Sequence, residues 1–242
     1  MSATIPAGSS KAETLRALEQ AVIFEDSRFL VMNKPTGMAV HGGSGLSFGV
    51  IEGLRALRPT APYLELVHRL DRDTSGCLLI AKRRSALRAF QKQQEARQVH
   101  KHYLALVKGE WHGGHRKVDA PLTKAIGKSG ERIVRVDAGG RRSISFFAPL
   151  QRFTGATLMR VKLITGRTHQ IRVHASHTGH PIAGDSKYGD AAFNEAMAEI
   201  GLGRLFLHAS SIRFEIPEVA TYEIDAPLDP RLEELLGRLV KL

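Results

Sequence analysis

The segment His68–Gly76 places two carboxylates, Asp71 and Asp73, among basic side chains. The runs on either side, Tyr63–Val67 and Cys77–Ala81, are apolar and typical of β-strands, so the charged segment is predicted to be a loop where strands end. Loops held by rigid strands often carry catalytic groups. Arg side chains nearby keep a carboxylate ionised, and an ionised carboxylate can act as a nucleophile or a base. The loop is therefore a candidate catalytic segment, although it would be a poor source of a general acid.

A purely structural interpretation of the same loop stays open. Asp, Thr, Ser and Gly are frequent in turns, where their side chains bond to nearby backbone amides. We expect this simpler role for residues 73–76, while Asp71 remains a candidate for either role.

The charge of the chain indicates a polyanionic partner. Its 242 residues contain 35 Lys and Arg against 24 Asp and Glu, a net charge of +11. Nucleic acid is the expected partner. Aromatic residues make up only 6% of the chain, too few for an extended stacking platform, so folded RNA bound through phosphates with one extruded base fits better. A non-catalytic RNA-binding module would explain the charge equally well, but such a surface gains nothing from a carboxylate at Asp71.

Cysteine use and hydropathy indicate a soluble cytoplasmic protein. The single cysteine, Cys77, cannot form an intramolecular disulfide, and its apolar neighbours predict a core residue. No apolar stretch approaches the ~20 residues that span a bilayer. We therefore expect a cytoplasmic protein with no membrane partner.

The eleven histidines raise the alternative of a metal site, above all His174 with His177 and His169. The chain has no His-Glu-x-x-His motif, no Cys pair and no acidic residue at ligand spacing. We therefore expect neither a metal nor another cofactor.

The elements that position these residues alternate between strands and helices. Residues 1–20 are predicted to be a flexible N-terminal tail or linker, with order beginning near Glu19 to Ile23, and residues 21–242 to form one domain. This alternation indicates a mixed α+β domain. Local sequence patterns do not determine the order of its strands. The expected strands are Phe29–Met32, Thr157–Leu163 and one further strand near the end that contains Phe206–Ala209 and Ser211–Phe214. The expected helices are Ser47–Leu57, Ser85–Gln98 capped by Ser85, and a final helix with Pro230 at its first position.

Four motifs stand out along the chain: Asn33–Gly37 with Val40 and His41, the loop His68–Gly76, Lys101–Tyr103 before an apolar strand, and Thr165–His174. Together they resemble, in the family's order, those of the RluA-type pseudouridine synthases, and the resemblance spans about residues 21–215. It implies a mostly antiparallel, bifurcated central sheet flanked by helices, with the active cleft across its middle. Relatives often carry an S4-type RNA-binding domain, for which we expect no room in this chain.

The resemblance implies roles for individual residues. Asp71 would be the catalytic nucleophile and Arg172 its ion-pair partner, although a surface Arg bound to phosphate is the alternative. Tyr103 would stack on the flipped uracil and help to remove its C5 proton, whereas the sequence pattern alone makes it a packed strand residue. Arg69 would fill the space that the extruded base leaves. For two further candidates a simpler role is open: Lys34 is alternatively a turn residue exposed to solvent, and His68 alternatively only supports the loop. The further candidates for substrate or RNA binding are His68, Lys34, Arg167, Thr168, His169 and Gln170.

The resemblance implies an isomerase that converts specific uridines to pseudouridine. The substrate implied is 23S ribosomal RNA, with transfer RNA as the alternative and a non-catalytic RNA-binding module as the second class. The chemistry needs no metal or redox cofactor, and we expect the chain to act as a monomer.

Overall fold

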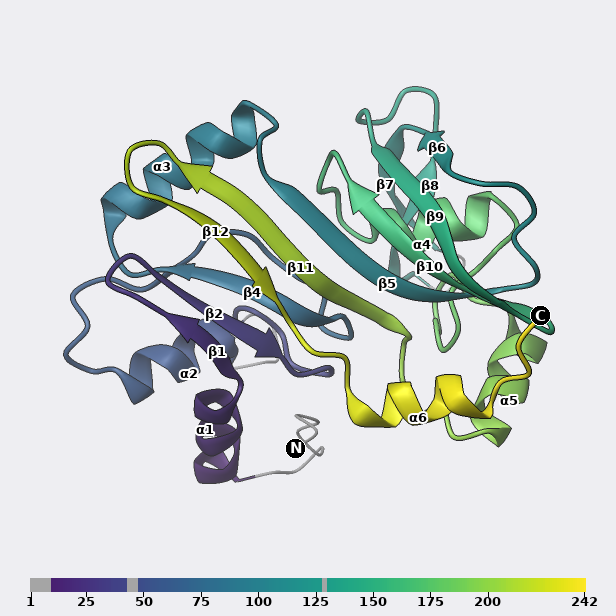
Figure 1. The fold of residues 1–242 in the computed structure, drawn as a ribbon, viewed down its shortest axis with the longest axis horizontal. Coiled ribbons are helices and arrows are strands. Elements are labelled where there is room, and N and C mark those ends of the chain that lie inside the picture. The colour runs from purple at the N-terminus through teal and green to yellow at the C-terminus, as the bar shows by residue number, and fades with distance from the viewer. Residues whose placement is uncertain (1–9, 43–47, 128–129) are drawn as a thin grey trace. The chain divides into compact units, whose positions relative to one another are not determined.

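The computed structural model describes residues 10–42, 48–127 and 130–242 (Figure 1). The chain forms two compact units. The first comprises Met1–His100 and Ala209–Pro230, and the second Lys101–His208 and Arg231–Leu242. The chain therefore passes from one unit to the other three times, and neither unit is one continuous stretch of sequence. That residues 21–242 act as a single catalytic domain stays a prediction.

The first unit is built on a sheet in which β1, β2, β4 and β11 are successive neighbours, with β11 belonging to this unit from Ala209 onward. The β1–β2 and β2–β4 pairs are antiparallel. Two strands branch from this path, since β3 pairs with β4 and β12 pairs with β11. The strands are β1 (Val22–Glu25), β2 (Phe29–Lys34), β3 (Glu65–Leu66), β4 (Ser75–Ala81), β11 (Leu207–Ile216) and β12 (Ala220–Asp225); the helices are α1 (Lys11–Gln20), α2 (Val50–Leu57) and α3 (Arg84–Glu95).

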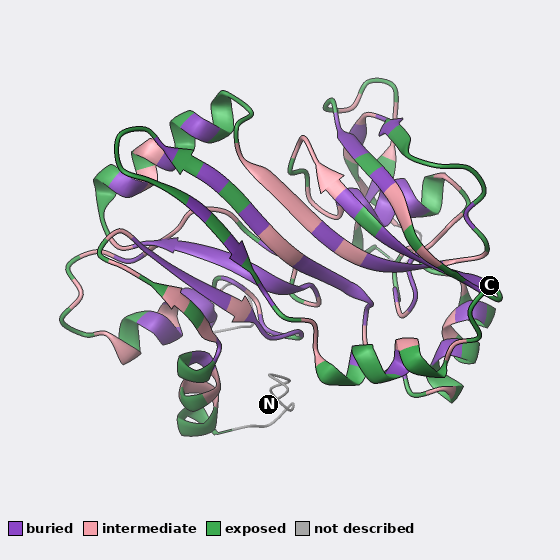
Figure 2. Cartoon of the chain, viewed as in Figure 1, coloured by how far each residue is buried: buried purple, intermediate pink, exposed green. Residues whose placement is uncertain are grey.

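The core of the first unit lies against β4, which is buried along its whole length (Figure 2). An aromatic cluster packs in this core. The ring of Phe214 meets Phe29 and Phe90 edge-on at centroid distances of 5.3 and 4.9 Å, and stacks on Tyr222 at 4.8 Å. Aromatic pairs with this geometry add to the stability that apolar burial provides. The core thus fixes the strand that follows the Asp71 loop.

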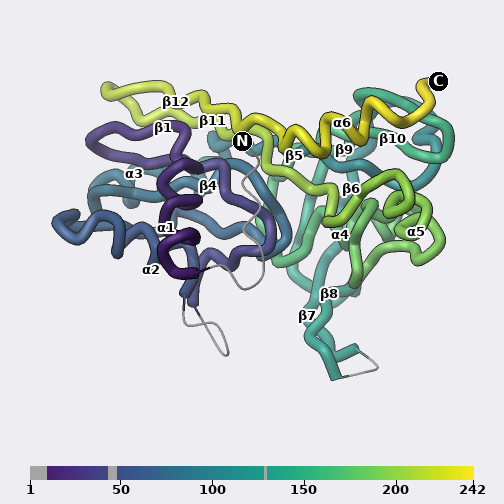
Figure 3. The backbone as a smooth tube through the Cα atoms, turned by 90° about the horizontal axis from the view of Figure 1, so that it is seen from below, coloured from purple at the N-terminus to yellow at the C-terminus, as the bar shows by residue number. Residues whose placement is uncertain are grey.

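The second unit contains a sheet in which β5, β10, β9 and β6 are successive neighbours, and a separate hairpin of β7 and β8 that projects from the unit (Figure 3). Leu122 and Val134 of this hairpin pack against Val173 of α4. The strands are β5 (His100–Lys108), β6 (Arg116–Asp119), β7 (Leu122–Ile126), β8 (Arg132–Val136), β9 (Ile144–Phe153) and β10 (Ala156–Leu163); the helices are α4 (Gln170–His177), α5 (Ala191–Glu199) and α6 (Pro230–Arg238).

The α+β class and the mostly antiparallel sheet are confirmed, since β2–β4, β5–β10 and β9–β10 are among the antiparallel pairs. The strands expected at Phe29–Met32 and Thr157–Leu163 are present, and α6 begins at Pro230 with Leu232 and Leu235 buried. Within the described ranges, no helix is long and apolar enough to cross a membrane.

Two local expectations were wrong. Residues 11–20 form the helix α1, because the side chain of Ser10 accepts from the Glu13 backbone N–H while the Glu13 carboxylate accepts from the Ser10 N–H. This reciprocal capping box starts a helix where a flexible tail was expected. Helix α3 begins one residue before Ser85, so Ser85 is inside the helix and Arg83 occupies the cap position. The start of the helix expected at Ser47 lies outside the described residues.

Candidate active site

The Asp71 loop joins β3 to β4 in the first unit and is built as a turn. The Thr74 backbone N–H donates to the Asp71 carbonyl at 3.2 Å, and the Asp73 carboxylate accepts from the neighbouring Arg72 Nε at 3.2 Å. Gly76, the second residue of the buried strand β4, has φ +108°, and a Cβ there would lie 2.2 Å from the Ala209 carbonyl oxygen. Residues 71–74 therefore form the turn, whereas Ser75 and Gly76, which were also expected to shape it, already belong to β4. Asp71 itself is half-buried at the start of the turn.

A second turn, which follows β2 and contains Thr36, is hydrogen-bonded to the backbone of this loop. The Lys34 side chain is 0% exposed, and its ammonium donates to the carbonyls of Pro35, Met38 and Arg72 at 2.8, 2.9 and 3.0 Å. The Thr36 hydroxyl donates to the Asp73 carbonyl at 2.7 Å. Lys34, expected to bind RNA or remain in solvent as a turn residue, is instead a buried clamp on backbone carbonyls, because a buried ammonium must be paired or hydrogen-bonded. Its contribution is to the shape of the Asp71 loop.

The first two residues of the loop, His68 and Arg69, have different surroundings. His68 accepts the Leu79 backbone N–H at its Nε2 atom over 3.2 Å, so the ring supports the loop against β4. Arg69 is exposed, as a side chain that enters RNA must be. The RNA-binding roles of both residues stay predictions.

Tyr103 lies on β5 in the second unit, 6% exposed and opposite Val161 of β10. Lys101 is two residues earlier, so its side chain leaves the same face of the strand. Burial lowers the pKa of Lys101 to about 8. Lys101 was not among the predicted site residues, although it stands in the motif that contains Tyr103. A strongly shifted group beside a predicted catalytic residue marks this face of β5 as a candidate site.

Gln170, the first residue of α4, is an internal brace. Its side-chain oxygen accepts from the Thr165 hydroxyl and the Arg167 N–H at 2.8 and 3.0 Å. Its amide nitrogen donates to the Ile144 carbonyl and the Ser145 hydroxyl at 3.0 and 2.9 Å. With 2% exposure and these four bonds, Gln170 shapes the turn before α4 and does not present its amide to RNA, contrary to our expectation.

The turn before α4 displays the other candidates of this segment. Arg167 is exposed, whereas Thr168 and His169 are half-buried. His169 occupies the cap position with φ +54°, a left-handed conformation that residues other than glycine seldom adopt. Its Nδ1 atom lies 2.7 Å from the Tyr188 hydroxyl, which holds the ring in place. Contacts of these three residues with RNA stay predictions.

Two of the histidines considered as metal ligands, His169 and His174, have other partners. His174 is fully buried, with Nδ1 3.0 Å from the Ser145 hydroxyl and Nε2 3.0 Å from the Ala120 carbonyl. Burial lowers the pKa of His174, which favours the neutral ring in this position. Among residues 10–42, 48–127 and 130–242, no group of three or more His, Cys, Asp or Glu side chains could hold a metal ion.

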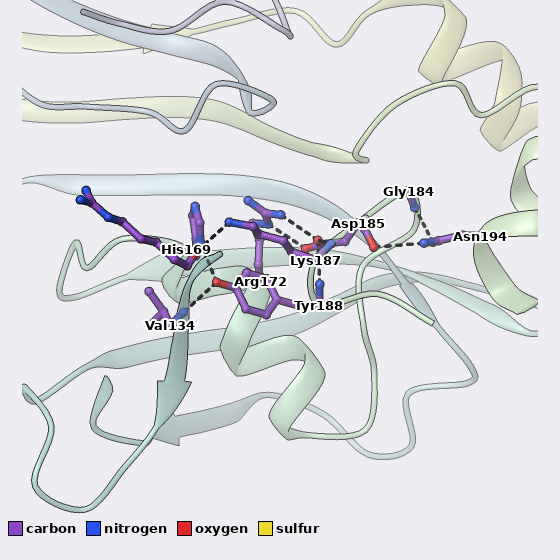
Figure 4. A network of polar contacts seen from close by, with 9 residues as sticks. Val134, His169, Arg172, Gly184, Asp185, Lys187, Tyr188 and Asn194 are labelled. Atoms are coloured by element: carbon purple, nitrogen blue, oxygen red, sulfur yellow. Dashed lines mark hydrogen bonds and ion pairs between the residues drawn. The ribbon is translucent and has the colours of Figure 1, made fainter. Parts of the chain in front are cut away.

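Arg172 forms a buried ion pair that the sequence did not reveal. Its Nε and Nη2 atoms donate to the two carboxylate oxygens of Asp185, each at 2.7 Å (Figure 4). Burial raises the pKa of the Asp185 carboxyl, but the Arg172 guanidinium and two backbone N–H groups outweigh it and lower the pKa overall. Asp185 lies 13 residues after Arg172 in a separate turn, and a single sequence carries no signal for such a pairing.

The predicted catalytic residues divide between the two units. Asp71 belongs to the first, and Tyr103 and Arg172 belong to the second. The pairing of Arg172 with Asp71 that the resemblance implies stays a prediction, as do the catalytic roles of all three residues.

Comparison with known proteins identifies the family. The family model described as RNA pseudouridylate synthase matches residues 28–177. The "Ribosomal large subunit pseudouridine synthase C" of Pasteurella multocida (strain Pm70) is 57% identical over 232 residues, 96% of this chain and 71% of the relative. The protein of the same name from Escherichia coli (strain K12) is 53% identical over 234 residues, 96% of this chain and 73% of the relative.

Solved structures agree with this result. "Human RNA Pseudouridylate Synthase Domain Containing 1" superimposes with a TM-score of 0.76 at 25% identity, covering 98% of this chain and 92% of that chain. The chain belongs to the RNA pseudouridylate synthase family and is an RNA-modifying isomerase.

Proposed function

We propose that this chain converts specific uridines of 23S ribosomal RNA to pseudouridine, with Asp71 acting as the nucleophile on a flipped-out uridine. The names of the curated relatives, which match 96% of the chain, support a large-subunit RNA substrate. The observation that carries the assignment of Asp71 is the construction of its loop. The Lys34 ammonium and the Thr36 hydroxyl tie the backbone on the C-terminal side of Asp71, at Arg72 and Asp73, to a second turn.

The reaction needs little beyond correctly placed side chains. The N1–C1′ bond of the uridine breaks, the uracil turns, and a C5–C1′ bond forms, while the C5 proton is lost and N1 gains a proton. Reactants and product are isomers, so no oxidant or reductant is consumed. Asp71 would supply the carboxylate at the sugar, either by attack on C1′ or by removal of a sugar proton to give a glycal. Holding this carboxylate in a fixed turn provides the orientation that such a step requires.

The proposed partners of Asp71 divide the remaining tasks. Tyr103 offers a flat ring against which the detached uracil can stack and a hydroxyl that can take part in removing the C5 proton. Arg69, exposed on the same loop, would occupy the gap left by the extruded base and so offset part of the unstacking cost of about a few kcal/mol. Arg172 would keep Asp71 ionised.

The experiment that tests the proposal is tritium release from RNA labelled at uridine C5, with unmodified ribosomal and transfer RNA as separate substrates. We expect release from ribosomal RNA, and none from that RNA with Asp71→Asn. The matched control is Asp73→Asn, which removes a carboxylate two residues away whose side chain contacts Arg72. It should keep turnover within about threefold of wild type, because an exposed ion pair contributes less than about 1 kcal/mol.

RNA affinity measured alongside separates the alternatives. Asp71→Asn should bind ribosomal RNA as wild type does, and binding should weaken steeply as salt rises from about 50 to 200 mM, because phosphate contacts release counterions. Release from transfer RNA alone would replace the substrate in the proposal. Substantial turnover by Asp71→Asn would show that Asp71 is not the nucleophile. Intact binding with no release from either RNA would leave the non-catalytic RNA-binding module.

A further inference from the structure

Arg172 is held in one orientation by its surroundings in the second unit. The bidentate ion pair with Asp185 fixes the plane of its guanidinium, and the guanidinium carbon lies 5.1 Å from the centroid of the Tyr188 ring. The Arg172 side chain is 6% exposed and that of Asp185 is 0% exposed. Fork-to-fork pairing of this kind adds geometric precision as well as binding energy.

Asp185 is held by further hydrogen bonds besides its ion pair with Arg172. Its Oδ1 atom also accepts the backbone N–H groups of Lys187 and Tyr188, at 2.9 and 3.0 Å. The side chain of Asn194 in α5 donates to the Asp185 carbonyl at 3.0 Å and accepts the Gly184 N–H at 2.8 Å (Figure 4). The carboxylate therefore has little freedom to follow the guanidinium if the latter moves.

Tyr188 connects the same cluster to neighbouring elements. Its hydroxyl accepts the backbone N–H of Val134 in β8 at 2.9 Å and lies 2.7 Å from Nδ1 of His169. With the Val134 bond made, the hydroxyl proton is available for His169, which favours the ring tautomer with its proton on Nε2. The cluster thus ties α4, α5 and the β7–β8 hairpin to the two residues that clamp Arg172.

We infer that Asp185 is a positioning residue for the isomerisation, acting through Arg172. Asp185 engages two of the five N–H donors of the guanidinium and leaves three to face a second partner, while it prevents rotation of the plane. This inference rests on the proposed function, in which the second partner is the Asp71 carboxylate. A residue that only stabilised the fold would affect melting but not the rate of the folded enzyme.

A double-mutant cycle tests this dependence. Asp185→Asn, Arg172→Lys and the double variant are compared in single-turnover tritium release at saturating ribosomal RNA. Asn presents an N–H₂ group or a single oxygen to the guanidinium, so we expect the rate constant to fall by about 100-fold, the loss typical of a misplaced catalytic partner. RNA affinity should change by less than about threefold. Arg172→Lys keeps the charge but cannot form the fork, and should lose a comparable factor.

The outcome is decided by the double variant. If Asp185 acts through Arg172, the double variant is no slower than the slower single variant. If the two losses multiply, or if Asp185→Asn melts earlier but turns over at the wild-type rate, the positioning role is overturned. The matched control is Asp190→Asn, which removes a nearby carboxylate that pairs with Lys108 but keeps an oxygen to cap α5. It should retain the wild-type rate.

Two further measurements keep the test decisive. If Asp185→Asn does not fold, Asp185→Glu replaces it: the carboxylate is retained but displaced by one methylene, and a wild-type rate in that variant overturns the inference. The Arg172 Nε–H resonance, followed by ¹⁵N NMR, should be protected from exchange in wild type. It should lose that protection in Asp185→Asn and in Asp185→Glu, both of which keep Arg172. If wild type releases no tritium, the proposed function fails, whereas the resonance still reports whether Asp185 holds the guanidinium.

Discussion

Replacement of Lys34 by Met should destabilise the protein strongly, although the two side chains have similar size. In wild type the fully buried ammonium satisfies three carbonyl oxygens, those of Pro35, Met38 and Arg72. Met offers no donor. Each buried carbonyl left without its partner costs about 1–3 kcal/mol, so three such losses amount to about 3–9 kcal/mol. The variant recovers part of this, because burying an ammonium costs several kcal/mol.

The net loss expected for Lys34→Met is therefore about 2–4 kcal/mol in the free energy of unfolding. For a chain of this size, such a loss lowers the melting midpoint by roughly 5–15 °C. Thermal and urea unfolding followed by far-ultraviolet circular dichroism measure both quantities. The folded fraction of the variant should also turn over more slowly, because the Arg72 carbonyl that it releases is adjacent to Asp71.

The matched control is Lys82→Met in the same unit. The Lys82 ammonium donates to the Asp26 carbonyl and pairs with Glu25, both at 2.6 Å, but its side chain is 25% exposed. Water can replace these contacts, so the control should lose less than about 1 kcal/mol. A Lys34→Met protein within 1 kcal/mol of wild type, or one no less stable than the control, would refute the clamp. Full turnover in a folded variant would refute its link to the Asp71 loop.

Three other predictions follow from single residues. Gly76→Ala should lower the free energy of unfolding by more than about 2 kcal/mol, because the residue has φ +108° and its Cβ would lie 2.2 Å from the Ala209 carbonyl oxygen; an unchanged melting curve would contradict this. Burial raises the pKa of Cys77 to about 12, so the native protein should resist thiol reagents at pH 8 and react only when unfolded in urea; rapid native labelling would disprove it. Burial lowers the pKa of Lys101 from 10.5 to about 8, so between these values the unfolded chain binds more protons and stability rises with pH. Lys101→Met lacks this pH dependence. Between pH 7.5 and 10 the free energy of unfolding of wild type should therefore rise by up to about 3 kcal/mol relative to that of the variant, and a difference that stays constant with pH would exclude the lowered pKa of Lys101.

Much of the fold could be predicted because local patterns determine it. The apolar run at Phe29–Met32 forms part of β2, and the leucines after Pro230 form the buried face of α6. The start of α1 was missed because its capping box joins Ser10 and Glu13 at the edge of a stretch rich in small polar residues. Short polar signals of this kind are easily assigned to a tail when no strong apolar periodicity follows them.

The candidate site was less accessible to sequence reasoning. Residue type showed that Lys34 and Gln170 were polar and stood in motifs, but it did not show that both are buried and bonded to the backbone. Burial depends on elements distant in sequence, which a single chain read locally does not identify. The same reason hid Asp185, whose pairing with Arg172 requires the turn after α4 to fold back on the helix. A residue that positions another is therefore harder to predict than one that carries the chemistry.

The discontinuous composition of the two units has a consequence for synthesis on the ribosome. The first unit needs residues Ala209–Pro230, which are made after nearly all of the second unit. Phe214 and Tyr222, which complete its aromatic core, emerge late, so the strands before residue 100 wait for their last neighbours. N-terminal domains usually fold first during translation. Here the strands before residue 100 are instead completed only after residue 209 has been made, and a nascent chain that stops before residue 209 should expose the unfinished core of β4 to chaperones.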